Sequence, residues 1–138
     1  MIIDGTNLIA GRLSTYVAKK ALLGEEIEVI NSEKVMITGD KKITLEKQRQ
    51  RLARGYPYKG PFIQRNEDKF LRRIIRGMLP YKQERGKKAF ARIKCHIGTP
   101  EELKDKEKTT IEKADIKNTQ TLKYIRLSEL CKLMGKKE

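Results

Sequence analysis

The chain has 138 residues, with 32 Lys and Arg side chains against 18 Asp and Glu, which gives a formal net charge of +14. This length is typical of one domain, the apolar runs are too short to span a bilayer, and the N-terminus lacks the pattern of a secretion signal. Two cysteines in such a chain predict reduced thiols and no disulfide framework, so composition favours a single intracellular domain, residues 1–138, with a polyanionic partner.

The first forty residues predict a parallel β-α-β unit. Residues 2–4 are typical of a short strand, and residues 12–23 place small and aliphatic side chains on one face of a helix. Residues 26–31 alternate as a strand does, and residues 35–37 predict another strand. The turn that follows ends at Asp40, whose side chain can cap a helix.

The positive charge is concentrated in the middle of the chain. Residues 41–95 contain 18 basic and 4 acidic side chains, a net charge of +14, whereas residues 1–40 have −2 and residues 96–138 have +2. Nine of the 18 basic side chains are Arg, which suits bidentate contacts with phosphate and stacking on bases. The central segment therefore predicts binding to nucleic acid, although a solvated charged surface is the simpler alternative.

Residues 41–55 favour a helix that has little to bury. Lys47, Arg51 and Arg54 recur at positions i, i+4 and i+7 and share one side. Like charges at this spacing destabilise an isolated helix, and a polyanion would relieve the repulsion.

Residues 55–61 must form a loop, because two Pro and two Gly prevent regular structure. Tyr56 and Tyr58 lie in this loop beside the basic Lys59. Aromatic side chains between basic ones can stack on unpaired bases, but they can also cover the edge of the core, and both interpretations remain open.

Residues 66–78 give the clearest helix, with Asn66 as a possible cap and acidic residues in the first turn. One face is apolar and is predicted to be core, with Ile74 in its middle: Phe70, Leu71, Ile74, Ile75 and Met78. The opposite side is basic and is predicted to face phosphate: Lys69, Arg72, Arg73 and Arg76.

The remaining elements alternate between polar and apolar stretches. Residues 81–88 predict a basic loop, and residues 93–97 a buried strand. Residues 101–121 are expected to be peripheral, residues 123–127 to form an edge strand, and residues 128–134 a short helix with Cys131 facing inward.

The side chains that carry most enzyme chemistry are sparse. His96 is the single histidine, the two cysteines lie 36 residues apart at no recognised metal-binding spacing, and no glycine-rich phosphate loop occurs. We therefore expect no catalytic residue, no metal, no cofactor and no small-molecule substrate.

An ordered set of motifs resembles the large-subunit ribosomal protein L-thirteen family, in its archaeal and eukaryotic form, over about residues 2–100. The motifs are Gly11-Arg12-Leu13, Val29-Ile30-Asn31-Ser32-Glu33-Lys34-Val35, Ile75-Arg76-Gly77-Met78-Leu79-Pro80, Arg85-Gly86, Arg92-Ile93-Lys94 and Gly98-Thr99-Pro100. The resemblance implies a three-layer α/β/α fold around a small, about four-stranded, mostly parallel sheet, with residues 101–138 as a peripheral extension. It also implies a structural role in the cytoplasmic large ribosomal subunit, early binding to large-subunit rRNA, and neighbouring ribosomal proteins as partners.

The candidate RNA-binding residues come from these two sources. The shared motifs contribute Arg12, Arg76, Gly77, Pro80, Arg85 and Gly86. Charge and aromatic content add Lys47, Arg51, Arg54, Tyr58, Lys59, Arg72, Arg73, Lys82, Lys87 and Lys88. The two glycines either let the backbone approach RNA closely or serve in turns and packing.

Two alternatives belong to other classes of protein. An RNA-modifying enzyme would use the parallel sheet as a nucleotide-binding scaffold, and a fold by itself does not exclude this. A free-standing RNA-binding regulator would not sediment with ribosomes.

Overall fold

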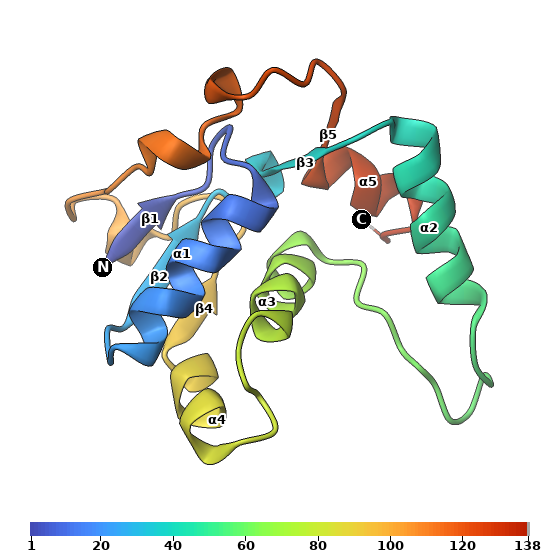
Figure 1. Ribbon diagram of the computed structural model, residues 1–138, viewed down its shortest axis with the longest axis horizontal. Coiled ribbons are helices and arrows are strands. Elements are labelled where there is room, and N and C mark those ends of the chain that lie inside the picture. The colour runs from blue at the N-terminus through green and yellow to red at the C-terminus, as the bar shows by residue number, and fades with distance from the viewer. Residues whose placement is uncertain (138) are drawn as a thin grey trace.

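The computed structural model describes residues 1–137 and centres on a parallel three-stranded sheet in the order β1-β2-β4 (Figure 1). β1 (Ile2–Asp4), β2 (Ile27–Ile30) and β4 (Ile93–Cys95) pair in register, and α1 (Ala10–Leu22) is the crossover between β1 and β2. A second sheet pairs β3 (Met36–Thr38) with β5 (Tyr124–Arg126) in antiparallel fashion. The α/β class, the mostly parallel sheet and the β-α-β unit are confirmed.

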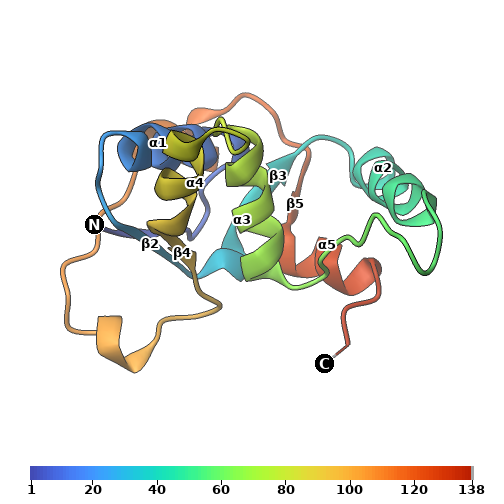
Figure 2. The ribbon, with the colours of Figure 1, turned by 90° about the horizontal axis from the view of Figure 1, so that it is seen from below.

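Helices cover one face of the parallel sheet. α1, α3 (Glu67–Gly77) and α4 (Glu84–Ala91) lie on the same side of β2 and β4 (Figure 2). On that side the alternate strand residues Ile3, Ile27, Val29 and Ile93 are fully buried against helical side chains. The opposite face carries a small cluster of Ile2, Ile30 and Leu103, the last from a 3-10 turn, so the second helical layer is reduced to one turn.

The C-terminal third completes the core. Ile125, Leu127, Leu130 and Cys131, from β5 and α5 (Leu127–Leu133), are fully buried, as the predicted edge strand and inward-facing cysteine require. Residues 101–121 are mostly exposed and follow the free edge of β1, where the Thr109 amide donates to the Ile2 carbonyl (2.9 Å).

Four local predictions need correction. The buried strand predicted over residues 93–97 ends at Cys95, and Ile97 is 49% exposed. The expected basic loop 81–88 includes the start of α4, since the Pro80 carbonyl accepts from the Gln83 amide and turns the chain directly into this helix. The Asn66 side chain makes no capping hydrogen bond. Ile75 and not Ile74 is the fully buried isoleucine of α3, because Ile74 lies at the edge of the core beside the space between α2 and α3, and Met78, also predicted as core, is 41% exposed.

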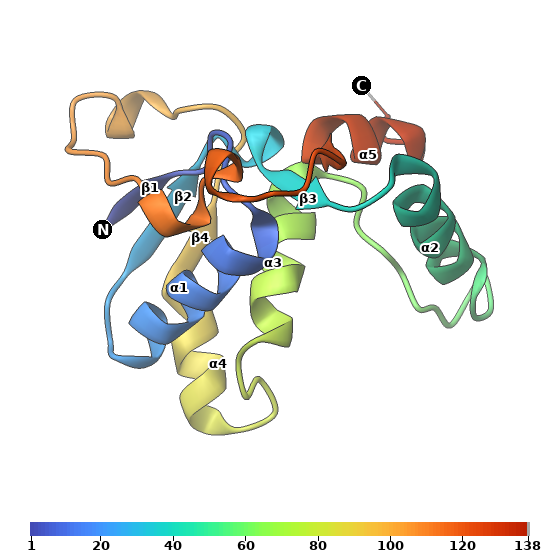
Figure 3. The same cartoon turned by 45° about the horizontal axis from the view of Figure 1, so that its top comes forward.

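Helix α2 (Lys41–Ala53) lies at one end of the molecule, beside α5 and away from the parallel sheet (Figures 1 and 3), and Lys41 pairs with Glu129 of α5 at 3.1 Å. The Asp40 side chain caps it by accepting from the Lys42 amide at 2.9 Å, as predicted. None of its residues is buried, although Leu45 and Leu52 touch the edge of the core. Space therefore remains between α2 and α3.

Candidate nucleic-acid interface

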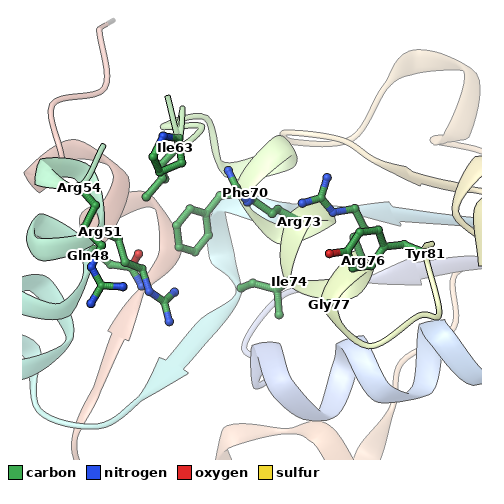
Figure 4. A pocket seen from close by; sticks show the side chains of 11 residues that line it. Gln48, Arg51, Arg54, Ile63, Phe70, Arg73, Ile74, Arg76, Gly77 and Tyr81 are labelled. Carbon is green, nitrogen blue, oxygen red and sulfur yellow. The ribbon is translucent and has the colours of Figure 1, made fainter. Parts of the chain in front are cut away.

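A pocket of about 400 Å³ lies between α2 and α3 (Figure 4). Its side chains come from α2, from the segment that joins the helices, from α3 and from the following turn: Gln48, Arg51, Arg54, Pro61, Ile63, Phe70, Arg73, Ile74, Arg76, Gly77 and Tyr81. We call it the arginine pocket, after Arg51, Arg54, Arg73 and Arg76. The fold thus brings together five of the predicted site residues, these arginines and Gly77, from α3 and from α2 with the residue that directly follows it, Arg54.

The charge of the arginine pocket is not neutralised within the described chain. None of the residues that line the pocket carries a carboxylate. In residues 1–137 every ion pair has a Lys or His cation, so no arginine is paired with Asp or Glu. Several guanidinium groups that share a concave surface without counter-ions attract anions strongly.

The basic side of α3 is held in place by neutral contacts. The Arg73 Nη1 donates to the Phe62 carbonyl (2.9 Å), the Arg76 guanidinium lies 5.0 Å from the centre of the Tyr81 ring, and Arg72 lies 4.4 Å from that of Phe90. Cation–π contacts orient a guanidinium and leave its charge available. Arg72 and Arg73 line a neighbouring hollow with Lys69, so the predicted basic side of α3 forms one continuous surface.

The aromatic loop forms a closed turn. The Tyr56 amide donates to the Gly60 carbonyl (3.0 Å), and the Lys59 amide donates to the Tyr56 carbonyl (3.1 Å). Tyr56 is 60% and Tyr58 85% exposed, so these rings do not cover the edge of the core, which was the simpler of the two interpretations. Lys59 is also exposed at the tip of this turn.

The two motif glycines have different surroundings. Gly77 is exposed, and a Cβ atom there would meet nothing within 4 Å. Gly86 is buried, and a Cβ atom there would collide with the Pro80 carbonyl group. Gly86 therefore allows α4 to pack against the turn that follows α3, which is the packing role, whereas Gly77 leaves the backbone of α3 open to the pocket.

The other predicted residues lie outside the arginine pocket. Exposed side chains on α4 and the turn before it form a second basic surface: Lys82, Arg85, Lys87 and Lys88. Lys47 is exposed on α2 but does not line the pocket. Arg12 does not line it either, and its Nη1 donates to the Lys113 carbonyl (3.0 Å).

Sequence reasoning missed several side chains of this surface. Gln48, Phe62, Ile63 and Tyr81 line the pocket or its neighbours, and the Arg65 Nη1 donates to the Gly135 carbonyl (3.3 Å). Phe62 and Ile63 lie in an irregular segment with no periodicity to read. Tyr81 could have been predicted from the sequence, because it is an aromatic residue that directly follows Pro80 and begins a basic stretch.

The described part of the chain offers little to other chemistry. No group of three or more potential metal ligands occurs within residues 1–137, and none of the helices there is long and apolar enough to cross a bilayer. The His96 Nε2 lies 2.9 Å from the Glu28 carboxylate, away from the pocket. Burial raises the pKa of the Cys95 and Cys131 thiols to about 12, so neither is an activated nucleophile.

Comparison with known proteins gives a consistent result. The family model described as Ribosomal protein L13 matches residues 1–102. The large ribosomal subunit protein uL13 of Methanosarcina barkeri is 45% identical over 137 residues, which cover 99% of this chain and 98% of that protein. The uL13 proteins of Methanopyrus kandleri and Archaeoglobus fulgidus are 43% and 42% identical, and each match covers 97% of this chain and 86% of the relative.

These matches extend through the C-terminal third, where the motifs alone carried no resemblance. They confirm the predicted family and the expectation of a ribosomal protein that is not an enzyme. With a family model matched over most of the chain and relatives above 40% identity along nearly all of it, the chain belongs to the ribosomal protein L13 family.

Proposed function

We propose that this chain is a structural constituent of the large ribosomal subunit, where it binds large-subunit rRNA through the arginine pocket and the basic surfaces of α3 and α4. Neighbouring large-subunit proteins are its other partners, and binding occurs early in subunit assembly in the cytoplasm. The identity of the relatives as large-subunit proteins supports the ribosomal setting.

One observation carries the RNA-binding part of the proposal. Four arginines, two from α3 and two from α2 and its C-terminal end, share one concave surface without a carboxylate among them. A phosphate backbone supplies negative charges at regular spacing, and Arg contacts phosphate oxygens in bidentate fashion. Contacts of this kind also explain why α2 needs no buried face of its own, since RNA bound against both helices would hold it in place.

The test measures the binding of the purified chain to large-subunit rRNA as a function of salt concentration. If about 6–10 phosphates are neutralised, the logarithm of the association constant falls against that of the salt concentration with a slope of about −4 to −9. The double variant Arg51→Gln/Arg54→Gln should reduce the size of this slope by about 1.4–1.8, because two phosphate contacts are lost.

The matched control removes the same charge elsewhere. Lys19 and Lys117 are exposed and line none of the pockets described above, so Lys19→Gln/Lys117→Gln should change the slope far less. Equal effects of both double variants would show that net charge, and not the arginine pocket, determines binding. Absence of the chain from large subunits in a sucrose gradient of cell lysate would contradict the ribosomal role.

A further inference from the structure

The floor of the arginine pocket is apolar, which phosphate binding does not require. Phe70 and Ile74 point from α3 into the space between the helices, and Arg51 and Arg54 belong to the opposite wall (Figure 4). Ile63 and Pro61 extend the apolar floor at one end. A surface that only tracks a phosphate backbone needs cations at the rim and no such floor.

The size and shape of the pocket restrict what can fill it. Its volume of about 400 Å³ lies within the ~300–1,000 Å³ of pockets that hold small organic ligands. A paired stretch of RNA presents its phosphates on a convex surface and keeps its bases stacked inside, so it can touch the arginines but not the floor. An unpaired nucleotide has a flat apolar base and a phosphate on each side, which matches an apolar floor with a cationic rim.

We infer that the arginine pocket receives one unpaired nucleotide of the RNA, with the base against Ile74 and the small exposed part of Phe70, a core residue that is 7% exposed, and with the flanking phosphates on Arg51, Arg54, Arg73 and Arg76. This inference rests on the proposed function and states which RNA element the site takes. Charge favours RNA over an apolar protein side chain, because every titratable group on the pocket wall except Tyr81 is an arginine.

The separation between α2 and α3 also supports an unpaired nucleotide as the occupant of the pocket. α2 buries none of its residues, and its arginines share the pocket with those of α3. Repulsion between these like charges opposes closure of α2 onto α3, so a cavity remains where two helices would otherwise pack. A nucleotide removes the repulsion through its phosphates and fills the cavity with its base.

Gly77 provides a clean way to block the pocket. It lies on α3 at the pocket wall, and no atom outside its own stretch of helix lies within 4 Å of the place that a Cβ atom would take, so the side chain of Gly77→Leu starts in open space beside the cavity. Gly11 is the matched control, since it is also exposed and helical with open space around it, but lies on α1 outside the pocket. Melting temperatures of both variants report whether they fold as the wild type does.

The experiment probes complexes with homologous large-subunit rRNA by base-reactive and backbone-cleaving reagents. The wild type and Gly11→Leu should protect the base of at least one unpaired nucleotide that becomes reactive again with Gly77→Leu, while the backbone footprint persists. Loss of one stacked base should weaken binding by Gly77→Leu about 10-fold. Unchanged base protection and affinity for Gly77→Leu would overturn the inference, whereas no footprint for the wild type would overturn the proposed function itself.

A second measurement does not depend on the Gly77 variant. Both native thiols have a raised pKa, so Gln48→Cys places a single readily labelled thiol at the pocket wall. A photo-crosslinker attached there should join the protein to an unpaired nucleotide of the bound RNA. Crosslinks confined to paired nucleotides would overturn the inference even if Gly77→Leu fails to fold.

Discussion

The ammonium group of Lys136 lies 2.8 Å from a carboxylate oxygen of Glu67, 69 residues earlier in the chain. Glu67 is 2% exposed and opens α3, the helix that carries most of the basic surface. The Arg65 Nη1 donates to the Gly135 carbonyl close by, so the segment after α5 is fixed to the start of α3 at two points.

Lys136→Met should destabilise the protein by about 1–3 kcal/mol, because it leaves a buried carboxylate without its counter-ion. Urea unfolding at pH 7 measures this loss. The double variant Glu67→Gln/Lys136→Met should recover part of the loss, since the uncompensated charge is then removed. Equal stability of Lys136→Met and the wild type would show that water replaces the ammonium group at no cost.

The same ion pair predicts a pH dependence. The hydrogen bond to Glu67 raises the pKa of Lys136 above its ordinary value of 10.5. A raised pKa in the folded state means that the stabilisation is fully present below pH 10.5 and is lost as the pH rises through the higher folded value. The difference in unfolding free energy between wild type and Lys136→Met should therefore shrink above about pH 10.5. A difference that stays constant up to about pH 12 would contradict an ionic contribution.

Gly86→Ala and Gly77→Ala should have opposite effects on stability, although both replace a helical glycine from the family motifs. Gly86→Ala forces a methyl group against the Pro80 carbonyl and should cost more than about 2 kcal/mol. Gly77→Ala meets open space and should be neutral or stabilising by up to about 1 kcal/mol, the ordinary helix propensity difference. Thermal unfolding of both variants distinguishes packing from local propensity, since propensity alone would stabilise both.

Ile75→Ala should destabilise the free protein by about 2–5 kcal/mol through lost burial and the cavity it leaves. The adjacent Ile74→Ala should cost less than about 1.5 kcal/mol, because Ile74 is only partly buried and faces the arginine pocket. Urea unfolding measures both losses of unfolding free energy, and because both changes are Ile→Ala, they differ only in position. A larger loss for Ile74→Ala would mean that α2 closes over the pocket in the free protein.

The thiols of Cys95 and Cys131 should react with iodoacetamide at pH 8 more than about 100-fold more slowly in the native protein than in urea. Burial raises the pKa of both to about 12, so thiolate is scarce at this pH, and unfolding restores an ordinary thiol. Mass spectrometry of the alkylated protein at timed intervals follows each site. Rapid modification of Cys131 in the native protein would show that α5 detaches readily from the core.

Patterns within a few residues of each other allowed most of the fold to be predicted. The alternation in residues 26–31, the amphipathic face of α1 and the cap at Asp40 depend on local spacing, and the structure confirms them. Local spacing did not locate Ile75 as the buried residue of α3, since the stripe is wide and only the neighbouring elements of the folded chain decide which part of it is covered. The helical start of α4 was missed although it is local, because the basic residues of 81–88 indicated a loop and the turn closed by the Gln83 amide and the Pro80 carbonyl was not recognised.

The sequence by itself determined the charge of the central segment, the residue types available for binding and the family. Tertiary structure alone decided that Arg51 and Arg54 share a pocket with Arg73 and Arg76, since the irregular segment of residues 54–66 separates α2 from α3. It also decided that Gly86 is needed for packing whereas Gly77 has open space beside it, because the role of a glycine depends on the atoms around the position that a side chain would take. Charge is a sum over residues and can be read from a chain, whereas concavity arises only when distant segments meet.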